Sequence, residues 1–73
     1  MKTYFWDFFG PRSEGTARHF RTHLIQFLEA QAIAGCDTGL ASEGTGHQAV
    51  YCRSPEPSAT IESLLKPKRC VES

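Results

Sequence analysis

Five aromatic residues occupy the six positions from 4 to 9 of this 73-residue chain, and this cluster restricts the fold more than any other feature. Aromatic residues favour β-strands, and alternate side chains of a strand point toward opposite faces of its sheet. The two resulting sets are Tyr4, Trp6 and Phe8 on one face, and Phe5, Asp7 and Phe9 on the other. Only one face can meet the core of the domain, so we expect the other to meet a second subunit, a ligand or a nucleic-acid base.

The chain length and the charge balance narrow the class of protein. A chain of 73 residues suits one domain, which we expect to span residues 1–73. A domain of this size buries only about 60% of its unfolded surface, so self-association would add stability. Eight basic and eight acidic residues give zero formal charge, which disfavours counterion-driven binding of nucleic acid.

Hydropathy and cysteine content indicate the compartment. No apolar run approaches the roughly 18 residues of a membrane span, and the aromatic N-terminal segment does not resemble a secretory signal. Cys36, Cys52 and Cys70 form an odd set without a Cys-x-x-Cys pair, which disfavours a disulfide framework and a zinc knuckle. We therefore expect a soluble cytoplasmic protein with reduced thiols and no membrane contact.

The first half of the chain predicts a strand followed by a helix. The strand runs from about Thr3 to Phe9 and ends at a Gly-Pro turn. Ser13 is expected to cap a helix that ends near Ala34, with Gly35 as its left-handed cap. One stripe of the helical wheel, which is mainly apolar, contains Ala17, Phe20, Leu24, Phe27, Leu28 and Gln31.

The second half predicts a hairpin, a second helix and a short last strand. Strands at Cys36–Ser42 and His47–Arg53 flank the glycine-rich segment 43–46. The two prolines in segment 54–57 are expected to start a helix in which Ile61, Leu64 and Leu65 form a narrow apolar face. Pro67 ends this helix, and a brief strand is expected at Arg69–Val71.

The order of these elements is strand, helix, strand, strand, helix, strand. Right-handed crossovers place the first strand beside the third in the centre of the sheet. This arrangement resembles the ferredoxin-like, or split βαβ, fold, in which two helices cover one face of a four-stranded antiparallel sheet. The resemblance is one of fold, and it implies an α+β class without implying a particular function.

Strand pairing predicts which side chains lie on the uncovered face. A turn that pairs Ser42 with Gly46 places Cys36 opposite Cys52, Thr38 opposite Val50 and Leu40 opposite Gln48. Because burial of an unpaired carboxylate is costly, we expect Asp7 on the open face and Tyr4, Trp6 and Phe8 in the core. The open face then contains Phe5, Asp7, Phe9, His47, Ala49, Tyr51 and Arg53.

An aromatic patch on an open sheet face indicates an interface. We therefore expect a non-catalytic binding or regulatory module, most simply a homodimer. The expected contact set is Phe5, Asp7, Phe9, Tyr51 and Arg53, with an ion pair between Asp7 and Arg53 that fixes the register.

Two other functions remain open. The first is binding of an anionic small molecule where the turn after the first strand, the hairpin and the entry to the last strand meet, a site formed by Arg12, Ser13, Gly44, Gly46 and His47. Ser42, Thr45, Lys66, Lys68 and Arg69 are expected at the same end of the sheet. The second is single-stranded RNA binding through Phe5 and Tyr51, although segment 46–52 lacks the basic start and the paired aromatics of the RNA-recognition module.

The sequence patterns that would indicate metal binding, thiol chemistry or catalysis are weaker than the pattern of the open face. His19 and His23 share one flank of the first helix, but two histidines are an incomplete metal site. Cys36 and Cys52 are expected to be core residues, whereas Cys70 is the accessible thiol. A hairpin tip that contains Ser42, Glu43 and His47 is convex and exposed, so we expect no cofactor and no metal. The same shape disfavours enzymatic activity, which would need a cleft between two subunits.

Overall fold

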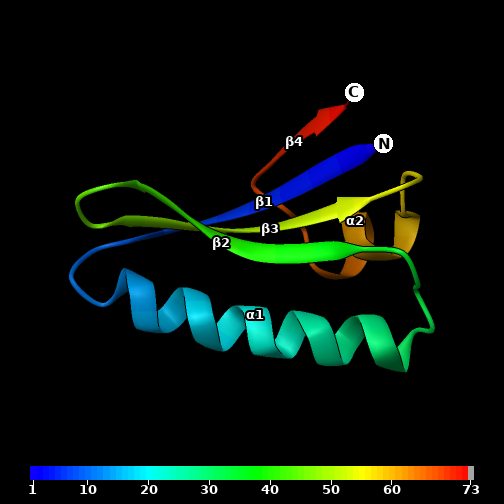
Figure 1. Ribbon diagram of the computed structural model, residues 1–73, viewed down its shortest axis with the longest axis horizontal. Helices are drawn as coiled ribbons and strands as arrows, with labels where there is room; N and C mark the ends of the chain where they lie inside the picture. The colour runs from blue at the N-terminus through cyan, green and yellow to red at the C-terminus, as the bar shows by residue number, and fades with distance from the viewer. Residues whose placement is uncertain (73) are drawn as a thin grey trace.

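The computed structural model describes residues 1–72 and contains four strands and two helices. The elements in chain order are β1 (Lys2–Phe9), α1 (Ser13–Ala30), β2 (Asp37–Gly44), β3 (His47–Ser54), α2 (Ala59–Leu64) and β4 (Arg69–Glu72). The strands form one antiparallel sheet in the order β2-β3-β1-β4. This confirms the ferredoxin-like α+β arrangement, including the short fourth strand, and Figure 1 shows α1 lying along one side of the sheet.

The core lies between the sheet and the two helices. Its buried members are Tyr4, Trp6, Val50 and Cys52 from the central strands, with Ala17, Leu24, Leu28 and Ile61 from the helices. The aromatic set Tyr4, Trp6 and Phe8 therefore points toward the helices, as predicted. Phe8 is half-buried and its ring centroid is 5.5 Å from that of Phe20. The opposite face of the sheet is free of helices.

The β2–β3 hairpin differs from the predicted register by two residues. Thr38 pairs with Cys52 and Leu40 with Val50, instead of the predicted Val50 and Gln48. The strands continue to Gly44 and His47, with an irregularity between Ser42 and Gly44. The chain reverses within Thr45 and Gly46, and the backbone φ of Gly46 is 71°, which favours glycine. A shift of two residues keeps every side chain on its predicted face.

The ends of α1 also differ from the prediction. Ser13 is the first helical residue and Arg12 the cap, without a side-chain capping hydrogen bond. The helix ends at Ala30, and the left-handed residue after it is Ala32, with a φ of 55°. The N–H groups of Ala32 and Ile33 donate to the carbonyls of Glu29 and Leu28. This pattern is a Schellman cap, which ends the helix before Gly35.

We expect Ala32→Gly to raise the free energy of unfolding by about 1 kcal/mol, because glycine adopts the left-handed conformation without steric cost. Urea unfolding followed by far-UV circular dichroism measures this change. Ala30→Gly, inside the last helical turn, is the matched control and should lower the free energy by roughly 0.5–1 kcal/mol. Equal destabilisation by both substitutions would contradict the left-handed cap at Ala32.

The second helix begins after the prolines instead of with them. Ser58 is its cap, and the Ser58 hydroxyl accepts a hydrogen bond from the Ile61 N–H at 3.2 Å. Ile61 is buried, but Leu64 is 63% exposed and does not belong to the apolar face. The Tyr4 hydroxyl accepts from the Ser58 N–H at 2.9 Å and donates to Glu62 at 2.7 Å. These bonds join α2 to the central strand.

Candidate functional site

The open face of the sheet contains the residues that strand alternation assigns to it. Phe5 pairs with Tyr51, Asp7 with Ala49 and Phe9 with His47 across β1 and β3. On the outer side of β1, Arg69 of β4 pairs with Phe5. On the outer side of β3, Gly39 and Ala41 of β2 pair with Tyr51 and Ala49. We define the open face as the side of the sheet on which these residues point away from the helices.

Asp7 is the centre of a hydrogen-bonded network on this face. Its carboxylate accepts hydrogen bonds from Arg69, from Nε to Oδ2 at 3.0 Å and to Oδ1 at 3.3 Å, and from Nη2 to Oδ1 at 2.9 Å. The His47 Nε2 lies 2.9 Å from the same Oδ1. The Asp7 side chain is only 12% exposed. The Arg69 hydrogen bonds, followed by that of His47, hold the pKa of Asp7 below its usual range, although burial opposes them.

The predicted pair between Asp7 and Arg53 is therefore wrong. Arg53 pairs with Thr3 in the register, two positions beyond Phe5 and toward the other end of the strand. Arg69 instead lies directly beside Phe5, because β4 forms and runs antiparallel to β1. Its bidentate contact with Asp7 is the geometry that a guanidinium prefers with a carboxylate.

The Arg69 side chain crosses the open face from β4 toward β2. Its guanidinium carbon lies 4.4 Å from the centroid of the Phe5 ring, in a cation–π contact. Nη2 also donates to Glu43 at 3.0 Å, and the two carboxylates raise the pKa of the guanidinium. Ala49 of β3 pairs with Asp7 and is fully buried although it lies on this face. The small Ala49 side chain leaves room for the crossing.

The other aromatic residues of the face differ in how much surface they offer. The Phe9 ring stacks on His47 with centroids 4.3 Å apart and is 72% exposed. Tyr51 lies against Gly39, where an added Cβ would overlap the tyrosine hydroxyl oxygen. Phe5 is half-buried beneath Arg69. Phe9 is therefore the most exposed aromatic ring of the open face, and it stacks on the imidazole that contacts Asp7.

The structure brings part of the predicted anion site together. The Gly10 N–H donates to the Gly46 carbonyl at 2.8 Å, which joins the turn after β1 to the β2–β3 hairpin. Arg12 is exposed, but Ser13 is buried and its N–H donates to the Gly10 carbonyl. Gly44 adopts a φ of 148°, and His47 points toward Asp7. The Asp7 carboxylate therefore lies beside His47, a residue that was expected to attract an anion.

The entry to β4 does not join this end of the sheet. The Lys68 N–H donates to the Phe5 carbonyl, half-way along β1, so Lys66 and Lys68 lie away from the hairpin. Arg69 reaches over the open face instead of lining the expected anion site. Sequence reasoning missed the position of Arg69 over the open face. A strand of only four residues is too short for its alternation pattern to show which side chains lie on that face.

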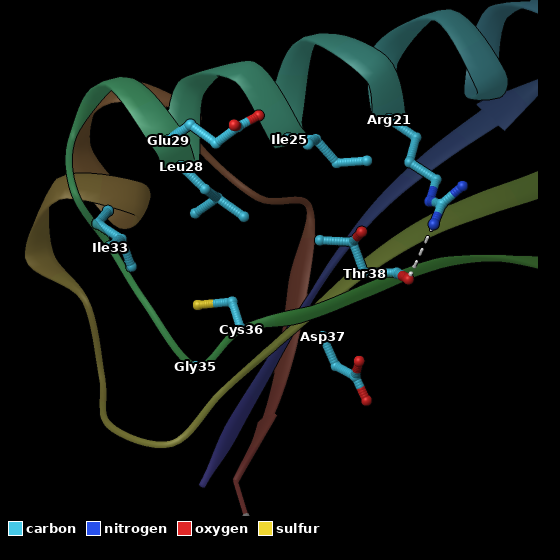
Figure 2. A pocket seen from close by; sticks show the side chains of 9 residues that line it. All are labelled: Arg21, Ile25, Leu28, Glu29, Ile33, Gly35, Cys36, Asp37 and Thr38. Atoms are coloured by element: carbon cyan, nitrogen blue, oxygen red, sulfur yellow. Dashed lines mark hydrogen bonds between the residues drawn. The ribbon is translucent and has the colours of Figure 1, made fainter.

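Sequence reasoning also missed a cavity of about 370 Å³ between α1 and β2. Figure 2 shows its lining, which combines the apolar side chains of Ile25, Leu28 and Ile33 with the Cys36 thiol, the Arg21 guanidinium and the carboxylates of Glu29 and Asp37. The cavity depends on how the end of α1 packs over the edge strand. No spacing in the sequence indicates such a gap.

The remaining titratable groups show no metal or thiol centre. His19 and His23 lie with their Nε2 atoms 3.0 Å apart, and residues 1–72 contain no group of three or more metal ligands. Cys52 is buried, and burial together with Cys36 raises its pKa to about 12, whereas Cys70 is exposed. In the same part of the chain, neither helix is long and apolar enough to cross a membrane.

Comparison of the chain with protein-family models, with curated proteins and with solved structures finds no match. We therefore infer the function from the geometry of the open face and of the cavity.

Proposed function

We propose that this protein is a non-catalytic binding or regulatory module that acts as a homodimer joined through the open face. The observation that supports this proposal most strongly is Phe9, which is 72% exposed and stacked on His47. His47 is in turn held by Asp7, so the ring is pre-ordered on a face without helices. Rigid aromatic residues of this kind are the usual anchors of protein interfaces.

A second copy of the chain is the partner that the charges favour. The formal charge is zero, so two copies approach without net repulsion. A two-fold axis perpendicular to the strands places the Arg53 end of one face over the Glu43 end of the other. In the same arrangement Phe9 of one copy meets the region of Val71, which is 54% exposed. This arrangement therefore places groups of opposite charge against each other and apolar groups against each other.

The size of the face is compatible with such a dimer. Four strands about 4.8 Å apart and up to eight residues long have a projected area of about 500 Å². Because side chains project from the sheet, the accessible area of this face is larger than its projected area. It approaches the roughly 800 Å² per partner of a standard interface. The network formed by Asp7, Arg69, His47 and Glu43 would then lie at the centre of the interface, where such groups fix register.

The two other functions have less support. An anion that approached His47 would meet the carboxylate of Asp7 at 2.9 Å from the imidazole. RNA bases need free aromatic rings on the central strands, but Arg69 covers Phe5, and Tyr51 lies against Gly39. The contact between His47 and Asp7 has the geometry of an acid–base pair, yet Arg69 already neutralises the carboxylate, which suits a structural role better.

We expect sedimentation equilibrium at micromolar concentration to give twice the monomer mass of 8.1 kDa. Phe9→Ser should weaken the dimer about 30-fold, because the loss of an aromatic anchor costs about 2 kcal/mol of association energy. Arg53→Glu should also weaken it, because the glutamate then faces the Glu43 end of the partner.

Leu64→Ser is the matched control, because Leu64 is 63% exposed but lies on α2, away from the open face. This variant should retain the dimer. A wild-type mass of 8.1 kDa at all concentrations would contradict the proposal. Equal weakening by Phe9→Ser and Leu64→Ser would place the contact elsewhere.

A further inference from the structure

The cavity between α1 and β2 has an apolar part, formed by α1 and the turn after it, and one basic end. Ile25, Leu28 and Ile33 project into it from α1 and the following turn, as Figure 2 shows. Arg21 lies at one end, beside Thr38. Asp37 is at the rim, but its carboxylate points away from the helix in the same view. The cavity lining therefore combines aliphatic carbons, a thiol and a guanidinium with the Glu29 carboxylate and the Thr38 side chain.

Arg21 is incompletely bonded for a partly buried cation. Its Nη2 donates to the Thr38 carbonyl over 3.4 Å, which is long for a hydrogen bond. Its Nε is buried without a hydrogen-bond partner. Within residues 1–72 it is the only buried side-chain nitrogen or oxygen that lacks one. A buried donor without an acceptor is destabilising. A carboxylate is the acceptor that engages Nε and Nη2 together, in a bidentate contact.

We propose that the α1–β2 cavity binds a small amphipathic monocarboxylate. The carboxylate pairs with Arg21, which turns away from its long bond to Thr38, and the alkyl or aryl tail lies among Ile25, Leu28 and Ile33. The volume of about 370 Å³ is at the lower end for small-molecule sites, which favours a compact ligand over a nucleotide. This site lies on the helix side of the sheet and is independent of the proposed dimer.

Titration of the ¹⁵N-labelled protein with octanoate, below its micelle-forming concentration, tests the proposal. We expect saturable amide shifts confined to segments 21–29 and 33–38. Affinity should rise about fourfold for each methylene from butyrate to octanoate, because the tail enters an apolar wall. Octanol and octylamine, which share the tail but not the anion, should bind at least tenfold more weakly.

Two substitutions and one control separate the role of the charge from that of the fold. Arg21→Gln removes the cation and should weaken octanoate binding at least tenfold. Ile25→Glu puts a carboxylate one helical turn from Arg21, where it replaces the ligand anion, and should abolish binding. Ile25 is 37% exposed, so the helix tolerates this change. Arg18→Gln alters a 68% exposed arginine that pairs with Glu14, and should leave binding unchanged.

Three results would overturn the proposal. The first is an absence of saturable shifts around the cavity in the wild-type protein. The second is equal affinity for octanoate and octanol, which would indicate apolar contact alone. The third is unchanged octanoate binding in Arg21→Gln. If that variant does not fold, Ile25→Glu and the ligand series on the wild-type protein decide the question.

Discussion

Replacing Trp6 by alanine should lower the free energy of unfolding by about 4 kcal/mol, the typical cost of removing a buried tryptophan. Trp6 is 4% exposed and its ring centroid is 5.1 Å from that of Phe20. Its indole N–H donates to the Leu65 carbonyl at 3.0 Å, so the substitution also leaves this acceptor without its donor. A domain of this length has about 4–11 kcal/mol of stability, so the substitution should remove between about a third and all of it.

Far-UV circular dichroism with urea is the suitable measurement, because Trp6 is the single tryptophan of the chain. Trp6→Phe keeps a ring against Phe20 and loses the bond to Leu65, so it should cost about 2 kcal/mol. Phe9→Ala removes an exposed ring from the same strand and should change stability by less than about 0.5 kcal/mol. The variants and the wild-type protein are measured at a concentration low enough for the chain to be monomeric, because self-association contributes to apparent stability. Similar losses for Trp6→Ala and Phe9→Ala would contradict the assignment of the two faces.

The difference between Trp6 and Phe9 was predictable from the sequence because strand alternation is a local rule. Five rings in six positions fix two faces as soon as the segment is a strand, and Asp7 identifies the face that is not the core. The β2–β3 register was two residues off, yet the faces of Leu40 and Val50 were correct. An even shift preserves side-chain orientation, so this error did not propagate to the open face.

The features that were missed depend on tertiary contacts. The end of α1 is set by hydrogen bonds around Ala32, a residue with no intrinsic preference for the left-handed conformation, instead of by Gly35. The partner of Asp7 is set by where β4 enters the sheet, and four residues of strand do not determine that position. The α1–β2 cavity results from packing at the edge of the sheet. Sequence patterns report periodicity and composition, and none of these three features is periodic.

Replacing Asp7 by asparagine should lower the free energy of unfolding near neutral pH by about 2 kcal/mol. The carboxylate accepts charge-assisted hydrogen bonds from Arg69 and His47, and asparagine keeps the shape without the charge. Glu43→Gln is the matched control. It weakens the other contact of the same guanidinium at a more exposed position, so its effect should be smaller.

The difference in stability between the wild-type protein and the Asp7→Asn variant should become smaller as the pH falls. Arg69 and His47 lower the pKa of Asp7 in the folded protein, whereas in the unfolded chain it is about 3.9. The stabilisation is therefore complete above about pH 5 and disappears as the pH falls through the lowered folded value. Urea unfolding of both proteins from pH 7 to pH 2 should show a constant difference that shrinks below about pH 4. A difference that persists unchanged at pH 2 would mean that the substitution acts through packing and not through the carboxylate charge.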